Sequence, residues 1–283
     1  MQDNDNVDAP KVSIYVSTFN RIDRLKRAID SVLRQDYTNW ELLICDDASS
    51  DGTEGYCLEL EKQDSRIRYF RNPTNLGACA ARNLGIFNAQ GMFITGLDDD
   101  DEFTSERLSF FVKNWRENFS FICCNFINKY TNTESIYYKN RDERRVFSYK
   151  DLLFENEASN QVFTLTSRLQ GIGGFNKDVK RLQDWDTWLR LAFKYGSFIR
   201  LNKPTYIMNH DHSPHEIRVS QNAKITESLL QLASRNSDIY KKYDLKYMEY
   251  LVDSMNKKAK LKDAIYWFYK KKNIKFIIKY LLQ

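Results

Sequence analysis

The first hundred residues alternate between strand-like and helix-like segments, and this alternation constrains the fold more than any other feature. Four segments rich in β-branched and other apolar residues are expected as strands, at 12–17, 41–45, 67–70 and 92–97. Segments with apolar residues at helical spacing lie between them, at 21–34, 54–62 and 79–88. Strands joined through helices form parallel βαβ units with right-handed crossovers. The sequence therefore predicts an α/β fold with a mostly parallel central sheet flanked by helices.

Small polar and acidic residues follow three of these strands. Ligands of parallel sheets bind outside the carboxyl ends of the strands, and here those ends carry Ser17 and Thr18, Asp46 and Asp47, and four aspartates at 98–101. Adjacent carboxylates resist ionisation, and a divalent cation that prefers oxygen ligands, Mg²⁺ or Mn²⁺, would balance them. A solvated turn that caps the next helix is the alternative for 98–101. Asp46 and Asp47 can likewise form an Asx-turn or a helix cap.

The regular alternation ends after residue 105. We expect a helix at 105–118, strands at 121–128, 136–138 and 161–166, a glycine-rich loop at 171–175 and an amphipathic helix at 184–195. The chain beyond residue 223 is predicted to be mostly helical.

Charge is distributed unevenly along the chain. The formal net charge of all 283 residues is +5, yet residues 241–283 hold 12 lysines and four acidic residues. The remaining body is mildly acidic, which argues against a nucleic-acid partner. In the basic region lysines alternate with aromatic and aliphatic residues such as Trp267, Phe268 and Tyr269. This composition is typical of a helix at a membrane surface, and the alternatives are a terminal helix packed on the body or a dimer contact.

Cysteine usage and hydropathy indicate a cytoplasmic protein. Five cysteines without a CxxC pair predict neither a disulfide framework nor a zinc knuckle, as is usual in a reducing cytosol. The first ten residues lack the apolar core of a signal peptide, and no uninterrupted apolar run approaches the 18 residues of a spanning helix. We therefore expect a location in the cytoplasm, peripheral on the inner face of the cell membrane.

Several motifs, taken in order, resemble those of glycosyltransferase family 2. They are VSIYVSTFN at 12–20, ICDDASSDGT at 44–53, NLG at 75–77 with ARN at 81–83, LDDDD at 97–101, and GIGGF at 171–175 with QDWDTWLRL at 183–191. The resemblance covers the chain to about residue 195. It implies the GT-A fold, a Rossmann-like fold of nucleotide-diphospho-sugar transferases, with a C-terminal helical extension. We predict a flexible N-terminus at 1–10, a nucleotide-sugar-binding half at 11–104, an acceptor-binding half of the same domain at 105–220, and a helical basic region at 221–283.

The resemblance also implies a donor site. Its residues would bind the nucleotide-sugar through side chains of the first four motifs, namely Ser17, Thr18, Asn20, Asp46, Asp47, Arg82, Asp98 and Asp99. In the family pattern the first position of the acidic motif faces the ribose and the third, here Asp100, binds the metal that bridges the diphosphate. The run of four aspartates leaves this register open by one residue.

The three histidines of the chain, at 210, 212 and 215, fall within six residues. Enzymes of the GT-A fold often complete the metal shell with a histidine late in the fold. His210 and His212 are both candidates, and they share one side of an extended segment. Imidazole together with carboxylate would favour Mn²⁺ over Mg²⁺. A polar loop that closes over the site is the alternative.

Gln183 and Asp184 correspond to the Glu-Asp pair of the family, whose second residue is the general base. Asp184 would take the proton of the attacking acceptor hydroxyl, although a simple helix cap is the alternative. Gln183 departs from the family pattern. Residues around this pair are expected to bind the acceptor, namely Gly173, Gly174, Trp185 and Asp186.

These features predict an inverting, metal-dependent glycosyltransferase. It would move a hexose of the Glc, Gal or GlcNAc type from a UDP-sugar to a hydroxyl of a polyprenyl-diphosphate-linked or oligosaccharide acceptor. Synthesis of O-antigen, other lipopolysaccharide or capsule is the expected setting. Two alternatives remain at this point: a metal-dependent nucleotidyl- or phosphotransferase, for which no P-loop is present, and a non-catalytic nucleotide-sugar-binding protein.

Overall fold

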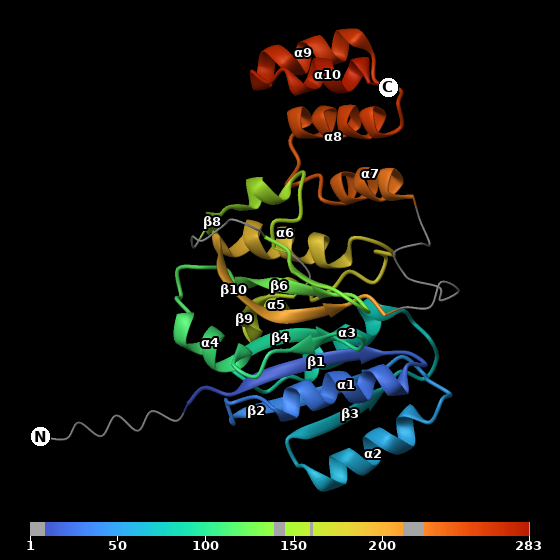
Figure 1. The fold of residues 1–283 in the computed structure, drawn as a ribbon, viewed down its shortest axis with the longest axis vertical. Helices are drawn as coiled ribbons and strands as arrows, with labels where there is room; N and C mark the ends of the chain where they lie inside the picture. The colour runs from blue at the N-terminus through green and yellow to red at the C-terminus, as the bar shows by residue number, and fades with distance from the viewer. Residues whose placement is uncertain (1–8, 139–144, 159–160, 212–223, 283) are drawn as a thin grey trace, which may run out of the picture. The chain divides into compact units, whose positions relative to one another are not determined.

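The computed structural model describes residues 9–138, 145–158, 161–211 and 224–282, which form two compact units (Figure 1). The sheet unit comprises Met1–Leu152, Asn156–Val179 and Gln183–Glu216. The helical unit comprises Leu153–Glu155, Lys180–Leu182 and Ile217–Gln283. Each unit is described by itself below.

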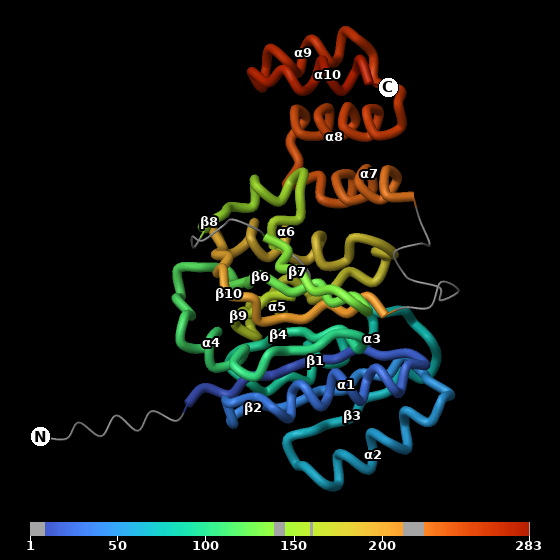
Figure 2. Tube along the Cα trace, in the orientation of Figure 1, coloured from blue at the N-terminus to red at the C-terminus, as the bar shows by residue number. Residues whose placement is uncertain are grey.

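The N-terminal half of the sheet unit is parallel, as predicted. Its strands are β1 (Val12–Thr18), β2 (Trp40–Asp46), β3 (Ile67–Arg71) and β4 (Phe93–Asp98), in the order β3-β2-β1-β4. Every neighbouring pair among them is parallel. The crossovers are α1 (Ile22–Leu33), α2 (Thr53–Gln63) and α3 (Ala78–Asn88). Figure 2 lets the chain be followed through these three βαβ units.

The same sheet continues into the later part of the chain with mixed strand directions. Its further strands are β5 (Glu102–Phe103), β6 (Ile122–Lys129), β7 (Glu134–Ile136), β8 (Arg145–Phe147), β9 (Phe163–Leu165) and β10 (Phe198–Asn209). Since β9 is antiparallel to both β4 and β6, and β10 is parallel to β6, the strands β4, β6 and β10 end at one edge. The helices here are α4 (Arg107–Asn114), α5 (Thr166–Gly171) and α6 (Gln183–Tyr195), with a 3₁₀ turn at Tyr149–Leu152.

Three expected elements differ from those observed. The helix expected at 105–118 is the shorter α4, and the strand expected at 161–166 is β9 followed directly by α5, which includes Gly171 of the expected loop. The strand expected at 136–138 is shifted to β7. Its pairing with β6 ends early because the Tyr138 amide donates to the Asn125 side-chain oxygen (3.0 Å) rather than to a backbone carbonyl.

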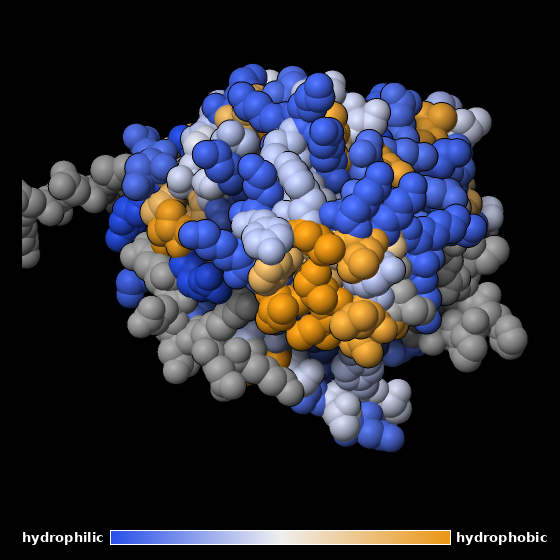
Figure 3. Space-filling model, turned by 90° about the horizontal axis from the view of Figure 1, so that it is seen from above, coloured by the Kyte–Doolittle hydropathy of each residue, from blue (hydrophilic) through white to orange (hydrophobic). Residues whose placement is uncertain are grey.

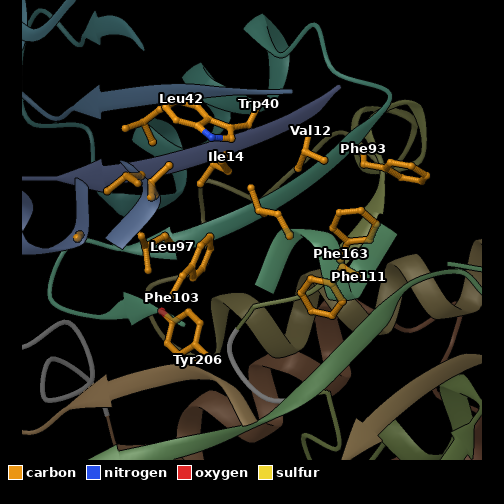
Figure 4. Close-up of a cluster of buried hydrophobic side chains, with 14 of the residues drawn as sticks. Val12, Ile14, Trp40, Leu42, Phe93, Leu97, Phe103, Phe111, Phe163 and Tyr206 are labelled. Atoms are coloured by element: carbon orange, nitrogen blue, oxygen red, sulfur yellow. The ribbon is translucent and has the colours of Figure 1, made fainter. Parts of the chain in front are cut away.

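The strands of the sheet unit are almost continuously apolar because they are buried in its core. Strands of a parallel sheet are covered on both faces, and β2 is buried along its whole length. On the other side of β1, rings from β4, β9 and α4 pack together: Phe163 lies 4.7 Å from Phe93 and 5.0 Å from Phe111 between ring centroids. Figure 4 shows these side chains converging with those of β1 and β2. All five cysteines are buried and free of disulfides.

The helical unit contains α7 (Ile225–Arg235), α8 (Lys242–Met255), α9 (Leu261–Lys271) and α10 (Lys275–Leu281). Its core forms around Trp267 of α9, whose ring lies 4.7 Å from Tyr247 and 6.1 Å from Tyr250 of α8. Phe276 of α10 completes this cluster. Across the described part of the chain, no helix has the length and apolar character needed to span a membrane.

Candidate active site

The end of β1 joins the acidic segments that follow β2 and β4. The Thr18 carbonyl accepts a hydrogen bond from the Asp47 amide (2.9 Å), and the Thr18 hydroxyl donates to Asp99 (2.8 Å). Ser17 is in register with Asp98 across the sheet. The Asn20 backbone amide donates to the Ser49 hydroxyl (2.8 Å), next to the acidic segment that follows β2. Residues predicted from three separate motifs thus meet at the carboxyl edge of the parallel strands, as expected for such a sheet.

The two aspartates after β2 stabilise the carboxyl edge of the sheet through hydrogen bonds. The Asp46 carboxylate is buried and accepts from the Tyr69 hydroxyl (2.6 Å) and from Arg71 (2.5 Å). The Asp47 carboxylate accepts from the backbone amides of Leu76 (2.9 Å) and Gly77 (2.7 Å). Asp46 is therefore directed into internal contacts, whereas Asp47 orders the loop that leads into α3.

The aspartates at 98–101 point to different partners. One Asp98 oxygen accepts from Arg82 (3.0 Å) and Gln161 (3.1 Å), and an Asp101 oxygen accepts from the Asn209 amide at the end of β10 (2.9 Å). The side chains of Asp98 and Asp100 are 23% and 17% exposed, against 7% for Asp99. The first and third aspartates of the run are therefore the more open ones.

This acidic run carries more negative charge than its surroundings balance. Burial, together with the Asp100 carboxylate, raises the pKa of Asp99 to about 7, despite the nearby Arg21 guanidinium. Burial and neighbouring carboxylates also raise the pKa of Asp100 and Asp101. A cation placed against Asp100 would relieve this repulsion, so the charge of the site suits a divalent metal.

The described residues supply few metal ligands of their own. They contain no group of three or more His, Cys, Asp and Glu side chains arranged to hold a metal ion. Mg²⁺ is commonly bound through one or two carboxylates, with substrate phosphates completing its shell. The site therefore suits a cation whose remaining ligands come from a diphosphate better than a cation held by protein ligands alone.

Arg82 of α3 links the donor side of the site to the start of α6. Its Nη2 donates to Asp98 (3.0 Å), and its Nη1 donates to the Gln183 side-chain oxygen (2.7 Å). The same Nη1 lies 3.8 Å from Asp184 Oδ1. The guanidinium also lies over the Phe175 ring, 5.0 Å from its centroid. One buried cation thus joins segments about one hundred residues apart in sequence.

Asp184 has the properties that a general base needs. It lies in the first turn of α6 and is 26% exposed, and its Oδ1 has no hydrogen-bond partner among the described residues. Burial raises its pKa to about 7, with Arg82 lowering and Asp98 raising it. A carboxylate with a pKa near neutrality can both accept and release a proton efficiently.

Two residues predicted to bind the acceptor have internal contacts instead. Trp185 is buried and donates its ring nitrogen to the Leu152 carbonyl (2.5 Å). Asp186 is also buried and pairs with Arg190 (2.9 Å), which donates to the Gly174 carbonyl (2.9 Å). Asp186 thus holds the glycine loop through Arg190, and the structure does not bring its carboxylate to the open part of the site.

The two glycines of this loop differ in their surroundings. Gly174 is buried with φ +65°, and a Cβ there would lie 2.4 Å from Asn83 Oδ1. Gly173 is exposed with φ +79°, and nothing lies within 4 Å of a Cβ built there. Asn83 clamps the loop by pairing with both the amide and the carbonyl of Phe175 (2.8 Å each). Gly174 is thus required for close packing, and Gly173 is the glycine open to a ligand.

His210 follows β10 at the edge where β4 also ends. Its Nε2 lies 2.8 Å from Asn128 Oδ1, and its ring stacks on Tyr130 with centroids 4.4 Å apart. His212 lies outside the described residues, as does the third histidine, at 215. The choice between His210 and His212 as a metal ligand therefore stays open.

Sequence reasoning missed several residues that shape the site. Arg21 bonds to Asp99 (3.2 Å) and lies 3.4 Å from Asp100, Gln161 bonds to Asp98, and Asn209 bonds to the backbone carbonyl of Asp100 (3.0 Å). Nothing in the spacing of these residues marks them out, since each comes from an ordinary helix start, strand flank or strand end.

Comparison with known proteins identifies the family of the chain. The family model described as glycosyl transferase family 2 matches residues 13–176, which is more than half of the chain. The chain belongs to glycosyltransferase family 2. This membership makes it a glycosyltransferase enzyme and confirms the predicted family, and it decides against the nucleotidyltransferase and non-catalytic alternatives.

Family 2 relatives match different lengths of this enzyme. The glycosyl transferase WcaA of Escherichia coli strain K12, named for colanic acid biosynthesis, is 33% identical over 246 residues, which are 84% of this chain and 85% of WcaA. A Campylobacter jejuni GalNAc(5)-diNAcBac-PP-undecaprenol beta-1,3-glucosyltransferase is 35% identical over 55% of this chain and 48% of its own length. The Escherichia coli glucosyltransferase WfgD is 42% identical over 41% of this chain and 45% of its own.

Solved structures share the fold. TarS 1–349 of S. aureus, solved in complex with UDP-GlcNAc, superposes with a TM-score of 0.68 at 16% identity, covering 95% of this chain and 78% of TarS 1–349. A mannosyltransferase of Pyrobaculum calidifontis, solved with GDP-Man and Mn²⁺, gives a TM-score of 0.59 at 15% identity, covering 96% and 83%. The predicted GT-A fold is thereby confirmed.

Proposed function

We propose that this family 2 enzyme is an inverting, metal-dependent glycosyltransferase that acts in the synthesis of a cell-surface polysaccharide. It moves a hexose of the Glc, Gal or GlcNAc type from a UDP-sugar to a hydroxyl of a lipid-linked or polysaccharide acceptor. The observation that carries this proposal is the Arg82 bridge, which sets a carboxylate of the donor edge, Asp98, beside an open carboxylate suited to be a base, Asp184.

The donor and acceptor classes are supported by relatives and structural neighbours. TarS was solved with UDP-GlcNAc, and WfgD is named as a UDP-Glc:alpha-D-GlcNAc-diphosphoundecaprenol beta-1,3-glucosyltransferase. The Campylobacter relative is likewise named for an undecaprenol-linked acceptor, and WcaA for colanic acid. A UDP-hexose donor and a polyprenyl-diphosphate-linked acceptor are therefore the first pair to test.

The donor would lie along the carboxyl edge of β1, β2 and β4. Thr18 and Asp99 are held together there by a hydrogen bond, and Asp47 orders the loop at 72–77 around the nucleotide. The open carboxylate of Asp98 would accept a hydrogen bond from the ribose, and Arg82 fixes the direction of this carboxylate. Prior orientation of this kind lowers the entropic cost of bringing the two substrates together.

Asp100, with His210 or His212, would hold a Mn²⁺ or Mg²⁺ ion. When bound, this ion would neutralise the negative charge that develops on the leaving diphosphate. The raised pKa of Asp100 supports the assignment, because a carboxylate crowded by buried neighbours gains most from a cation.

Asp184 would accept the proton of the acceptor hydroxyl during transfer. The acceptor oxygen forms a bond to the anomeric carbon, the bond from that carbon to the diphosphate breaks, and UDP leaves. Attack from the face opposite the diphosphate inverts the anomeric centre. The exposed Gly173 lies in the loop before α6 and would leave room for the acceptor sugar.

The helical unit carries a surface suited to an anionic membrane, which would keep the enzyme near a lipid-linked acceptor. Large apolar side chains in α9 and α10 or directly flanking α10 are exposed, including Leu261, Ile265, Tyr269, Ile274, Ile278, Leu281 and Leu282. Residues 261–282 also contain six lysines and one acidic residue. In Figure 3, which looks from the side of α9 and α10, apolar side chains gather in a patch bordered by hydrophilic ones. Apolar insertion combined with lysine attraction to anionic lipid is how interfacial helices bind.

The role of Asp184 is tested by Asp184→Asn. We expect transfer to fall by at least about a hundredfold, in line with the loss of general base catalysis, while UDP affinity stays unchanged. UDP release is measured with UDP-Glc, UDP-Gal and UDP-GlcNAc, Mn²⁺ and a synthetic GlcNAc-diphosphoundecaprenol acceptor, and UDP affinity by calorimetry.

The matched control is Asp178→Asn, which changes an exposed aspartate ahead of α6. It should leave both transfer and UDP affinity as in the wild type. Near-normal transfer by Asp184→Asn, or a loss of its UDP affinity, would remove Asp184 from the role of base.

A further inference from the structure

Gln183 and Asp184 compete for the same nitrogen of Arg82. The Gln183 side-chain oxygen accepts from Arg82 Nη1 at 2.7 Å, whereas Asp184 Oδ1 lies 3.8 Å from that nitrogen. The Gln183 amide in turn donates to the Val179 carbonyl (3.0 Å), which fixes the orientation of the side chain. At Nη1 the neutral amide of Gln183, and not the charged carboxylate of Asp184, therefore receives the hydrogen bond.

This arrangement leaves unpaired atoms in an otherwise well-bonded region. Asp184 Oδ1 and Arg82 Nε are both buried without a hydrogen-bond partner among the described residues. A buried guanidinium and a carboxylate normally close into a short ion pair, because isolated charges are costly to bury. Gln183 prevents this closure by occupying Nη1.

We propose that Gln183 is a positioning residue: by accepting the Arg82 hydrogen bond it keeps the guanidinium off Asp184 Oδ1 and so keeps that carboxylate a stronger proton acceptor for the acceptor hydroxyl. The inference rests on the proposed role of Asp184 as the base. A carboxylate that accepts a short hydrogen bond from arginine is a weaker proton acceptor, because the ion pair stabilises its charged form. The side chain at position 183 thus sets how strongly Asp184 can act.

Among the residues that the structure describes, the charged and titratable groups that face Asp184 come from three elements. Arg82 and Cys79 belong to α3, Asp98 ends β4, and Tyr15 belongs to β1. Burial raises the pKa of the Cys79 thiol to about 11 and the pKa of the Tyr15 hydroxyl well above its usual value, so both are neutral near pH 7. Arg82 and Asp98 therefore remain as the nearby charges, and Gln183 controls the position of Arg82.

Two substitutions at position 183 should shift the titration of Asp184 in opposite directions. Gln183→Ala frees Nη1 to close on Asp184, which should lower its pKa by on the order of one unit, as an opposite charge within hydrogen-bond range does. Gln183→Glu puts a second carboxylate on the same nitrogen, which should raise the pKa of Asp184 by a similar amount. A purely structural role would not give two shifts of opposite sign.

The titration is followed by ¹³C NMR of the aspartate carboxyl groups in full-length protein without ligands, between pH 5 and 9. The Asp184 signal is identified by its disappearance in Asp184→Asn. Gln170→Ala is the matched control, because Gln170 gives the Ile86 carbonyl a hydrogen bond of the same kind (2.9 Å) but none to Arg82. The control should titrate as the wild type, and circular dichroism confirms that each variant is folded.

An Asp184 midpoint that is equal in the wild type, Gln183→Ala and Gln183→Glu would overturn the proposal, as would two shifts of the same sign. The proposed function fails by a different result, namely transfer that survives in Asp184→Asn. With UDP-Glc and the diphospholipid acceptor, the midpoint on the acid side of the kcat–pH profile should shift together with the NMR midpoint of Asp184. The plateau value of kcat should be lower in Gln183→Ala than in the wild type.

Discussion

Two aspartates in the first turn of α6 differ in their surroundings because tertiary packing gives them different partners. Asp186 is buried and neutralised by Arg190 within its own helix, so its carboxylate is structural. Asp184, two residues earlier, lies 3.8 Å from Arg82 and keeps an oxygen without a hydrogen bond among the described residues. Residue type and helix position are alike in the two cases. The partner that tertiary packing supplies decides which of the two carboxylates is available for the proposed role of base.

The raised pKa of Asp184 has a consequence for stability. Its folded-state value of about 7 lies above its usual value of 3.8, so between these limits the folded protein holds a proton that the unfolded chain has lost. The stabilising contribution of Asp184 is therefore complete below about pH 3.8 and is lost as the pH rises through about 7.

Asp184→Asn removes this titration. The difference in the free energy of unfolding, variant minus wild type, should increase by about 2–4 kcal/mol in total as the pH rises to 7. Above pH 7 this difference should stay constant. Urea denaturation at pH 5, 6, 7 and 8 measures the difference, with Asp178→Asn as the exposed control. A difference between variant and wild type that is independent of pH would contradict the assigned shift.

At the scale of elements, α3 does more than connect two strands. It carries Arg82, which reaches Asp98 and Gln183, and Asn83, which clamps the loop at Phe175. It can do so because it packs unusually close to the sheet at Gly85. A Cβ at Gly85 would lie 2.6 Å from the Tyr15 Cβ and 2.8 Å from the Cys45 Sγ. The distance between α3 and the sheet therefore sets where the guanidinium lies.

Gly85→Ala should push α3 away from β1 and β2. We expect a loss of about 1–3 kcal/mol in the free energy of unfolding, the usual cost of overpacking a core. A reduced UDP affinity should accompany this loss, because Arg82 moves with the helix. Urea denaturation and calorimetry measure the two effects.

Gly55→Ala provides the matched control within another helix. Gly55 is exposed in α2, and nothing lies within 4 Å of a Cβ built there. The substitution should stabilise the enzyme by about 0.5–1 kcal/mol through helix propensity alone. Equal effects of the two substitutions would show that α3 has no close contact with the sheet.

At the scale of the whole molecule, catalytic and basic surfaces belong to separate units. The donor edge, Arg82 and Asp184 lie in the sheet unit, whereas the exposed apolar residues and lysines of α9 and α10 lie in the helical unit. The proposed chemistry and the proposed membrane attachment can therefore be tested independently.

Membrane attachment is tested by the double substitution Ile274→Glu and Leu281→Glu, at side chains that are 56% and 73% exposed. Binding to phosphatidylglycerol vesicles should fall roughly tenfold or more, because two apolar insertions are lost and two charges repel anionic lipid. Vesicle co-sedimentation measures binding, and higher salt should weaken the wild-type interaction.

Leu58→Glu with Val146→Glu, two exposed apolar residues of the sheet unit, is the control and should bind vesicles as the wild type does. Unchanged sedimentation of the Ile274→Glu and Leu281→Glu variant would assign this exposed apolar surface to another partner.

How far the sequence predicts this enzyme depends on the range of the interactions involved. The strands and helices of the first hundred residues could be placed because local hydrophobic patterns define them. Short elements such as β7 and α5 could not, because their ends depend on contacts such as the one between Tyr138 and Asn125. The donor edge was predictable because parallel strands bring their carboxyl ends together. The internal roles of Asp186 and Trp185 were not, since their partners are tertiary.

The sequence by itself determined the parallel half of the sheet, the edge at which the aspartates gather and the family to which the chain belongs, because these follow from local pattern and motif order. The tertiary structure alone decided that Arg82 bonds to Asp98 and Gln183 while lying 3.8 Å from Asp184. These partners are separated by up to about one hundred residues along the chain, so no local pattern encodes which of them shares the guanidinium. The packing of α3 and α6 against the sheet sets those distances, and in the proposed function they determine which carboxylate serves as the base.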